Sequence, residues 1–127
     1  MDLKQPLVDL VSRVDGAFGA ILADREGEEV SSYTLPGRTE RAESAGPERL
    51  KLIGAYQIIN LNTCQEMMQQ FQLGSVKQMI CRYEKATVLI RSLGGDYALI
   101  LAMENDGNVG KGIFYLNQAA EVISQDL

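Results

Sequence analysis

The sequence predicts an α/β (α+β) protein: a five-stranded antiparallel sheet, strand order 2-1-5-4-3, with helices on both faces. Helical and strand-like apolar spacings alternate along the chain in the order α-β-β-α-β-β-β-α. The segments 17–23 and 97–103 are apolar throughout, which is typical of strands buried on both faces. The segments 28–34 and 75–83 are more polar, which favours the two edges of the sheet. Short turns pair the strands that follow one another, and this completes the order.

The first part of the chain predicts a helix followed by a β-hairpin. Pro6 is compatible with the first turn of that helix, because a residue there needs no backbone donor. The hairpin joins 17–23 to 28–34 through the turn 24–27, in which Gly27 is free to adopt a positive φ. The apolar stripe of the helix consists of Leu3, Leu7, Leu10, Val11 and Val14.

A surface loop is predicted at 35–47, where proline and glycine lie among charged residues. Pro47 suits the first turn of the long helix that follows, over 48–73, which Gly74 would close. The core-facing stripe of this helix is predicted to be Leu50, Ile53, Ile58, Leu61, Cys64, Met68 and Phe71.

The long helix also carries a second apolar stripe. A helix that lies on a sheet needs only one apolar face. A further apolar face therefore indicates contact with a second copy of the chain, contact with another protein, or burial within the same chain. The second stripe consists of Leu52, Tyr56, Ile59, Thr63 and Met67.

The remaining segments complete the sheet and add a last helix. Strands are predicted at 75–83, 86–92 and 97–103, joined by turns at 84–85 and 94–96. Asn108 is the expected N-cap of the last helix. Its apolar stripe is Ile113, Leu116, Ala120, Ile123 and Leu127. The length of 127 residues predicts one domain, 1–127.

Charge and composition exclude several classes of function. The formal net charge of −5 argues against binding to nucleic acid and against docking on an anionic membrane. No apolar stretch approaches the ~20 residues of a membrane-spanning helix. Asp2, Lys4 and Asp9 interrupt any signal-peptide-like run at the N-terminus, so we expect a cytoplasmic protein without membrane insertion.

The sequence offers no arrangement of residues that is typical of an enzyme active site. The chain contains no histidine, so neither a Ser-His-Asp nor a Cys-His arrangement can form. Cys64 and Cys81 alone cannot hold zinc; we interpret them as small buried residues in a reducing compartment, with a disulfide or a reactive thiol as alternatives. The glycine-rich segment 107–112 lacks the spacing and the hydroxyl of a phosphate-binding loop. We expect no catalytic residue, metal or cofactor.

Three segments carry a resemblance to a known family. They are 14–27, an apolar strand that turns at an acidic-x-x-Gly; 74–80, after the long helix; and 89–101, the last strand pair. In this order they resemble the Roadblock (dynein light-chain-type) family, with its profilin-like fold, over about 3–123. The turn 24–27 lacks the Asn-x-Glu-Gly of eukaryotic dynein light chains, and a terminal helix extends beyond their usual end. Both features favour the bacterial or archaeal branch, which partners Ras-like gliding-motility GTPases.

The resemblance implies a homodimer with sheets joined edge to edge and long helices side by side. The expected interface is the second stripe together with Val76 and Gln78. Arg38 and Arg41 are candidate loop contacts, although solvated loop charges are the simpler interpretation. The implied function is a non-catalytic regulator or scaffold that binds a small Ras-like GTPase and stimulates hydrolysis by repositioning the GTPase's own residues. The alternatives are a structural adaptor subunit that leaves nucleotide turnover unchanged and a small-molecule sensor.

Overall fold

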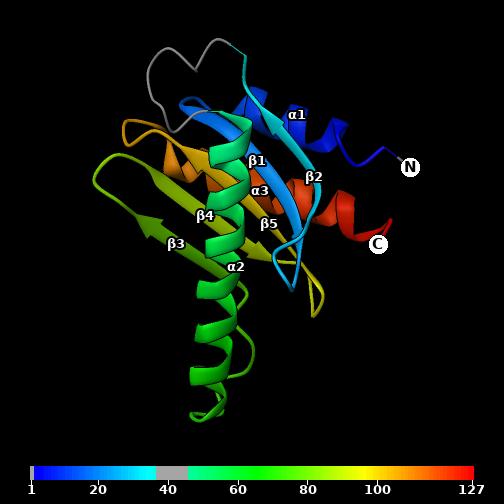
Figure 1. Cartoon of the computed structure of the whole chain (residues 1–127), viewed down its shortest axis with the longest axis vertical. Helices are drawn as coiled ribbons and strands as arrows, with labels where there is room; N and C mark the ends of the chain where they lie inside the picture. Colours follow the sequence, from blue (N-terminus) through cyan, green and yellow to red (C-terminus); the bar gives the residue numbers. More distant parts are fainter. Residues whose placement is uncertain (1, 37–45) are drawn as a thin grey trace.

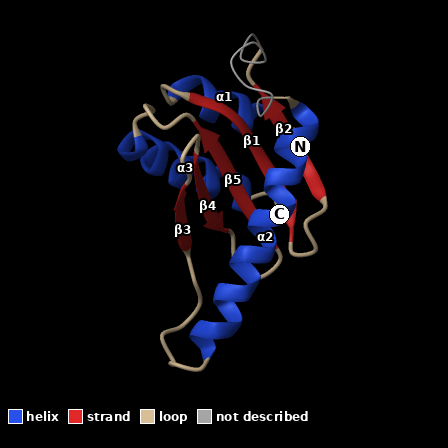
Figure 2. Ribbon diagram, turned by 60° about the vertical axis from the view of Figure 1, so that its left-hand side comes forward, coloured by secondary structure: helices blue, strands red, loops and turns tan. Residues whose placement is uncertain are grey.

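The computed structural model describes residues 2–36 and 46–127. The strand order β2-β1-β5-β4-β3 and the succession of helices and strands confirm the predicted topology. Helix α2 covers one face of the sheet, and α1 and α3 cover the other (Figures 1 and 2). The elements are α1 (Gln5–Arg13), β1 (Ala17–Asp24), β2 (Glu29–Thr34), α2 (Pro47–Gln69), β3 (Gln78–Arg82), β4 (Thr87–Ser92), β5 (Tyr97–Met103) and α3 (Val109–Ser124).

The central position of β1 and β5 follows from their side chains. Neighbouring residues of a strand point to opposite faces of the sheet. In β1, Ala20 and Leu22 join the apolar core under α1 and α3, whereas Ile21 and Ala23 join the core under α2. Apolar side chains of β1 therefore point to both faces of the sheet. The two strands pair in an antiparallel register that sets Ile21 opposite Ile100.

The two edge strands are less buried, as their polar residues predicted. The side chains of β2 and β3 are half-buried or exposed. Strand β3 pairs with β4 in a register that places Ile80 opposite Leu89. In the part of the chain that the structure describes, no strand pairs with the other edge of β3.

Helix α2 ends earlier than the predicted 73. It stops at Gln69, and turns follow in which Gln72 adopts a φ of +56°. Phe71 was expected in the core; this expectation is wrong, because Phe71 is 64% exposed. The C-terminal part of α2 runs past the end of the sheet, so no apolar layer lies beneath it (Figure 1). Leu127 was expected in the apolar stripe of the last helix, but it is exposed because α3 already ends at Ser124.

Two local predictions are confirmed. Gly27 adopts a φ of +86° in the turn between β1 and β2. Asn108 is the N-cap of α3, and its side-chain oxygen accepts a hydrogen bond from the Lys111 amide at 3.0 Å. Such a cap satisfies one of the backbone donors that the first turn of a helix leaves free.

Candidate partner interface

The second stripe lies on the face of α2 that points away from the sheet. Its four large side chains, Leu52, Tyr56, Ile59 and Met67, are between 52% and 64% exposed, and Thr63 is also exposed. Ile58 and Leu61, on the opposite side of the same helix, are buried. The described residues of this chain therefore do not cover the stripe. Within the described residues, the stripe is therefore open to contact with another copy or with another protein.

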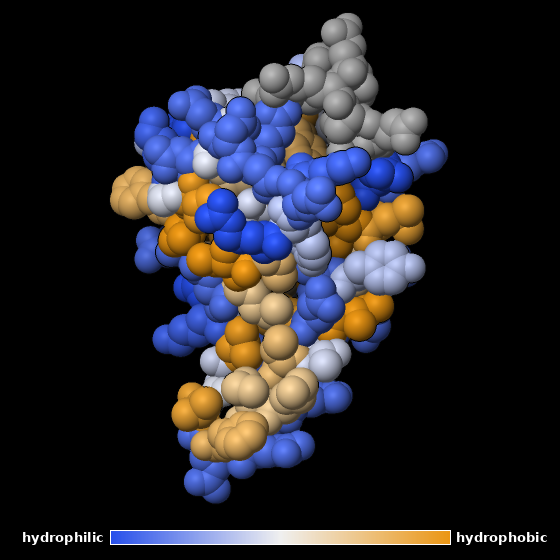
Figure 3. All heavy atoms as spheres, turned by 90° about the vertical axis from the view of Figure 1, so that its left-hand side faces the viewer, coloured by the Kyte–Doolittle hydropathy of each residue, from blue (hydrophilic) through white to orange (hydrophobic). Residues whose placement is uncertain are grey.

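The free edge of β3 and the helix α2 can both be seen from the same side of the molecule (Figure 3). Val76 and Gln78 are half-buried where the chain enters this edge. Ile80, in the middle of the strand, is 47% exposed, and Tyr83 just after it is about as exposed. Seen onto this side, apolar side chains extend from the middle of the molecule to the projecting end of α2 (Figure 3). An open edge and an apolar helix face thus occur together.

A buried glutamine connects α2 to the end of β3. Gln57 is only 5% exposed, and its side-chain nitrogen donates to the Tyr83 hydroxyl at 2.7 Å. Its oxygen accepts a hydrogen bond from the Asn60 side chain at 3.0 Å. A buried amide is costly unless both of its ends are bonded. This network therefore holds Tyr83 in a defined position at the edge of the sheet.

A second glutamine connects α2 to the start of β3. The Gln65 side chain accepts a hydrogen bond from the Val76 amide at 2.7 Å and donates to the Val76 carbonyl at 3.0 Å. It therefore pairs with Val76 as a neighbouring strand would. Sequence reasoning missed Gln57 and Gln65 because it counted apolar residues only. Their spacing was the available signal, since 50, 54, 57, 61 and 65 share one face of a helix.

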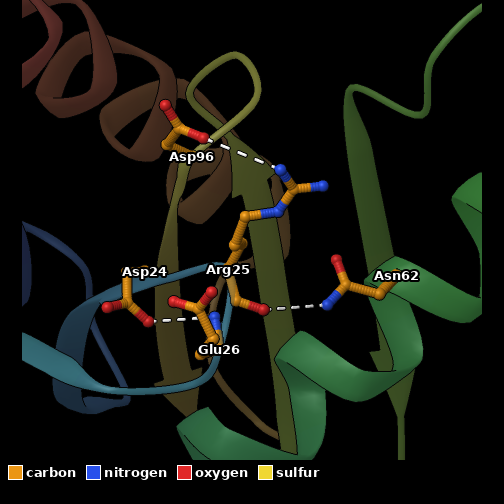
Figure 4. Close-up of polar contacts among 5 residues, drawn as sticks. All are labelled: Asp24, Arg25, Glu26, Asn62 and Asp96. Atoms are coloured by element: carbon orange, nitrogen blue, oxygen red, sulfur yellow. Dashed lines mark hydrogen bonds and ion pairs between the residues drawn. The ribbon is translucent and has the colours of Figure 1, made fainter.

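The turn between β1 and β2 is also held against α2. The Asn62 side chain donates to the Arg25 carbonyl at 3.0 Å, and the Asp24 carboxylate accepts the Glu26 amide at 2.9 Å (Figure 4). The Arg25 guanidinium lies 3.9 Å from the Asp96 carboxylate, with both side chains largely exposed. An ion pair of this kind contributes little stability. The hydrogen bond from the Asn62 side chain therefore connects this turn to α2.

Solved structures with the same architecture identify the fold. The Roadblock/LC7 domain from Streptomyces avermitilis superposes with a TM-score of 0.81 at 15% identity, over 97% of this chain and 95% of that one. The chain has the Roadblock fold. An MglB with a tetrameric arrangement gives a TM-score of 0.81 at 17% identity, over 95% of this chain and 84% of its own. MglC from Myxococcus xanthus gives 0.70 at 24% identity, over 97% of both chains. No protein-family model and no curated protein matches the sequence.

Within this fold, α2 packs closely on the sheet at Gly54. A Cβ atom on Gly54 would come within 2.9 Å of Cδ1 of Ile21, which is closer than such contacts normally allow. A glycine at this helical position therefore brings the axis of α2 toward β1. The second stripe is consequently carried by a helix that is packed tightly from below.

The structure places the other predicted features as follows. Arg38 and Arg41 lie outside the described residues. Cys64 and Cys81 are free and half-buried. Among residues 2–36 and 46–127, no three Cys, Asp or Glu side chains gather as metal ligands. Over the same ranges, no helix combines the length and the apolar character needed to cross a bilayer.

Proposed function

We propose that this chain is a homodimeric, non-catalytic regulator or scaffold that binds a small Ras-like GTPase. One observation carries the proposal: on a Roadblock fold, an exposed apolar stripe of α2 lies on the same side as an unpaired sheet edge. An exposed apolar helix face beside an open strand edge is typical of an interaction surface. Val76 and Gln78 would belong to the same interface as the second stripe.

Self-association is supported by the physical properties of both surfaces. An open strand edge presents unpaired amides and carbonyls, which form a template for another strand. Joining two β3 edges would produce one continuous sheet and place the two α2 helices side by side. The side of each second stripe that turns toward the neighbouring α2 would then lose contact with water, which is the main favourable contribution to association. An MglB, which has this fold, is known in a tetrameric arrangement.

The GTPase partner rests on the resemblance to Roadblock proteins. The proposed mechanism is a shift in population: the dimer binds the hydrolysis-competent conformation of the GTPase more tightly than its resting conformation. A protein can shift such an equilibrium only by the difference between its two affinities. The GTPase's own residues then carry out the chemistry, and this chain contributes no reacting side chain.

The experiment is light scattering of the chain alone and with a GTP-loaded Ras-like GTPase from the same genome, followed by hydrolysis assays. A mass of about twice 14.0 kDa that increases with the GTPase, and faster hydrolysis, would support the proposal. Stable binding with unchanged hydrolysis would indicate the structural adaptor instead. A monomer that binds none of several such GTPases would overturn both functions.

A further inference from the structure

Helices α1 and α3 contact each other on the face of the sheet opposite α2, and a groove runs between them (Figures 1 and 2). Helix α1 packs mainly on β1 and β2, whereas α3 packs on β4 and β5, so the groove lies over the middle of the sheet. Its volume is about 330 Å³. The groove is therefore separate from the second stripe and from the free edge of β3.

Apolar side chains form the floor and part of the walls of this groove. Leu10 of α1 and Ala119 of α3 are buried at its base. Pro6 and Tyr115 lie beside them and are half-buried. Val122 belongs to the α3 wall and is 47% exposed. A concave surface of this composition is typical of a binding site.

The secondary structure of the walls restricts the kind of ligand that fits. Both walls are α-helices, whose backbone amides and carbonyls bond to one another. An extended peptide in this groove would find no backbone partner for its own amides and carbonyls, and leaving these groups unpaired is costly. A helix satisfies its own backbone and packs through its side chains, as neighbouring helices do in helical bundles. The groove therefore fits a helix better than it fits a strand.

Acidic side chains border the groove on the α1 side. Asp9 of α1 and Asp2, which precedes this helix, both line it. The Asp2 carboxylate accepts a hydrogen bond from the Lys4 amide at 2.8 Å, and the Asp9 carboxylate accepts one from the Gln5 side chain at 2.9 Å. Both donors are neutral amides, and neither carboxylate forms an ion pair with a described residue. Their negative charge is therefore available to a basic ligand.

A single basic residue stands against these two carboxylates. Among the described residues that line the groove, Arg13 is the one with a positive charge. Its guanidinium lies 5.8 Å from the centre of the Tyr115 ring, at the end of α1. A cation is attracted to the face of an aromatic ring, so this contact holds Arg13 against α3. The lining as a whole is negatively charged.

We propose that this groove binds an amphipathic helix of a second protein, with basic side chains beside its apolar face. The apolar residues of that helix repeat at steps of three and four and fill the groove above Leu10 and Ala119. Its Lys or Arg side chains lie over the α1 rim, near Asp2 and Asp9. Helix α1 has nine residues and is about 14 Å long, so two to three turns of the partner helix are in contact. This site does not depend on the proposed dimer, because it lies on the opposite face.

Selection from a displayed library of random peptides tests the proposal. The peptides have about 14 residues, which is enough for four helical turns. The library is first depleted on a Val122→Lys chain and then selected on the unmodified chain, so that peptides bound elsewhere are removed. Val122→Lys places a charge in the apolar wall. Val30→Lys is the matched control, because Val30 is 42% exposed on β2 and does not line the groove. Thermal denaturation verifies that each variant folds.

The affinity of each selected peptide is measured by fluorescence anisotropy, and its helicity by circular dichroism. We expect apolar residues at helical spacing, flanked by Lys or Arg, in peptides that become helical on binding. Their affinity should fall roughly tenfold or more for Val122→Lys and stay unchanged for Val30→Lys. A library that yields no binder, or that yields acidic or extended peptides, would overturn the proposal.

The acidic rim is tested with the same peptides. Asp2→Asn combined with Asp9→Asn should weaken binding by about three- to tenfold, since each exposed ion pair contributes little. The control with the same change in charge combines Asp15→Asn and Asp126→Asn, at exposed positions that do not line the groove. This control should bind as the unmodified chain does. Equal affinities of the two double variants would overturn the assignment of a basic partner helix.

Discussion

Replacing Ile59 with alanine should weaken the dimer without weakening the fold. Complete burial of an isoleucine side chain stabilises by about 1.5–3 kcal/mol. Since 57% of Ile59 is exposed in the single chain, dimerisation accounts for about 1–1.5 kcal/mol of this per copy. A twofold interface contains the residue twice, so Ile59→Ala should cost about 2–3 kcal/mol per dimer. The dimer dissociation constant should then rise roughly 30- to 150-fold.

Sedimentation equilibrium measures this dissociation constant directly. The matched control is Ile58→Ala, the same change one residue earlier, where the side chain is 2% exposed in the core under α2. That variant should lower the free energy of unfolding by about 2–5 kcal/mol. The two isoleucines thus separate an effect on association from one on folding. An Ile59→Ala dimer that dissociates no more readily than the unmodified protein would refute the assignment of the second stripe to the interface.

Three further changes test the surfaces around this residue. Tyr56→Glu should give a monomer by light scattering, because a buried, unpaired carboxylate is costly, whereas Tyr56→Phe should stay dimeric; a dimeric Tyr56→Glu protein would contradict the interface. Gln65→Ala removes two hydrogen bonds to Val76, so the free energy of unfolding should fall by about 1–3 kcal/mol. The hydrogen of the Val76 amide should also exchange with solvent faster. An unchanged exchange rate would show that the Gln65 side chain does not protect this amide. Asn108→Ala should cost about 0.5–2 kcal/mol in thermal denaturation, whereas Asn108→Ser should retain most of the cap; equal losses in the two variants would argue against capping.

The strand order was predictable because it depends on a property that each strand carries locally. The apolar residues on both faces of β1 and β5 require cover from two sides, which only the middle of the sheet provides. The end of α2 was not predictable in the same way. Periodicity continues to Phe71, but whether a sheet lies beneath that residue depends on how far the strands extend. Such information belongs to the assembled layers and not to the helix itself.

The candidate interface also contains some features that local sequence predicts and others that depend on the assembled fold. The second stripe follows directly from helical spacing, since Tyr56 and Ile59 cannot face the sheet when Ile58 and Leu61 do. The polarity of β3 predicted that it is an edge strand, but the exposure of Ile80 also depends on the reach of α3, which β3 alone does not reveal. The bonds of Gln57 and Gln65 required knowledge of which loops return to α2.

The amide contacts of α2 have a kinetic consequence. Gln65 and Gln57 fix both ends of the edge strand within the single chain, at Val76 and at Tyr83. A surface that is already ordered loses little conformational freedom when a partner arrives. Encounter should therefore be limited by orientation, with association rates of about 10⁵–10⁷ M⁻¹s⁻¹. Differences in affinity among variants of the second stripe should then appear mainly in how long the complex lasts.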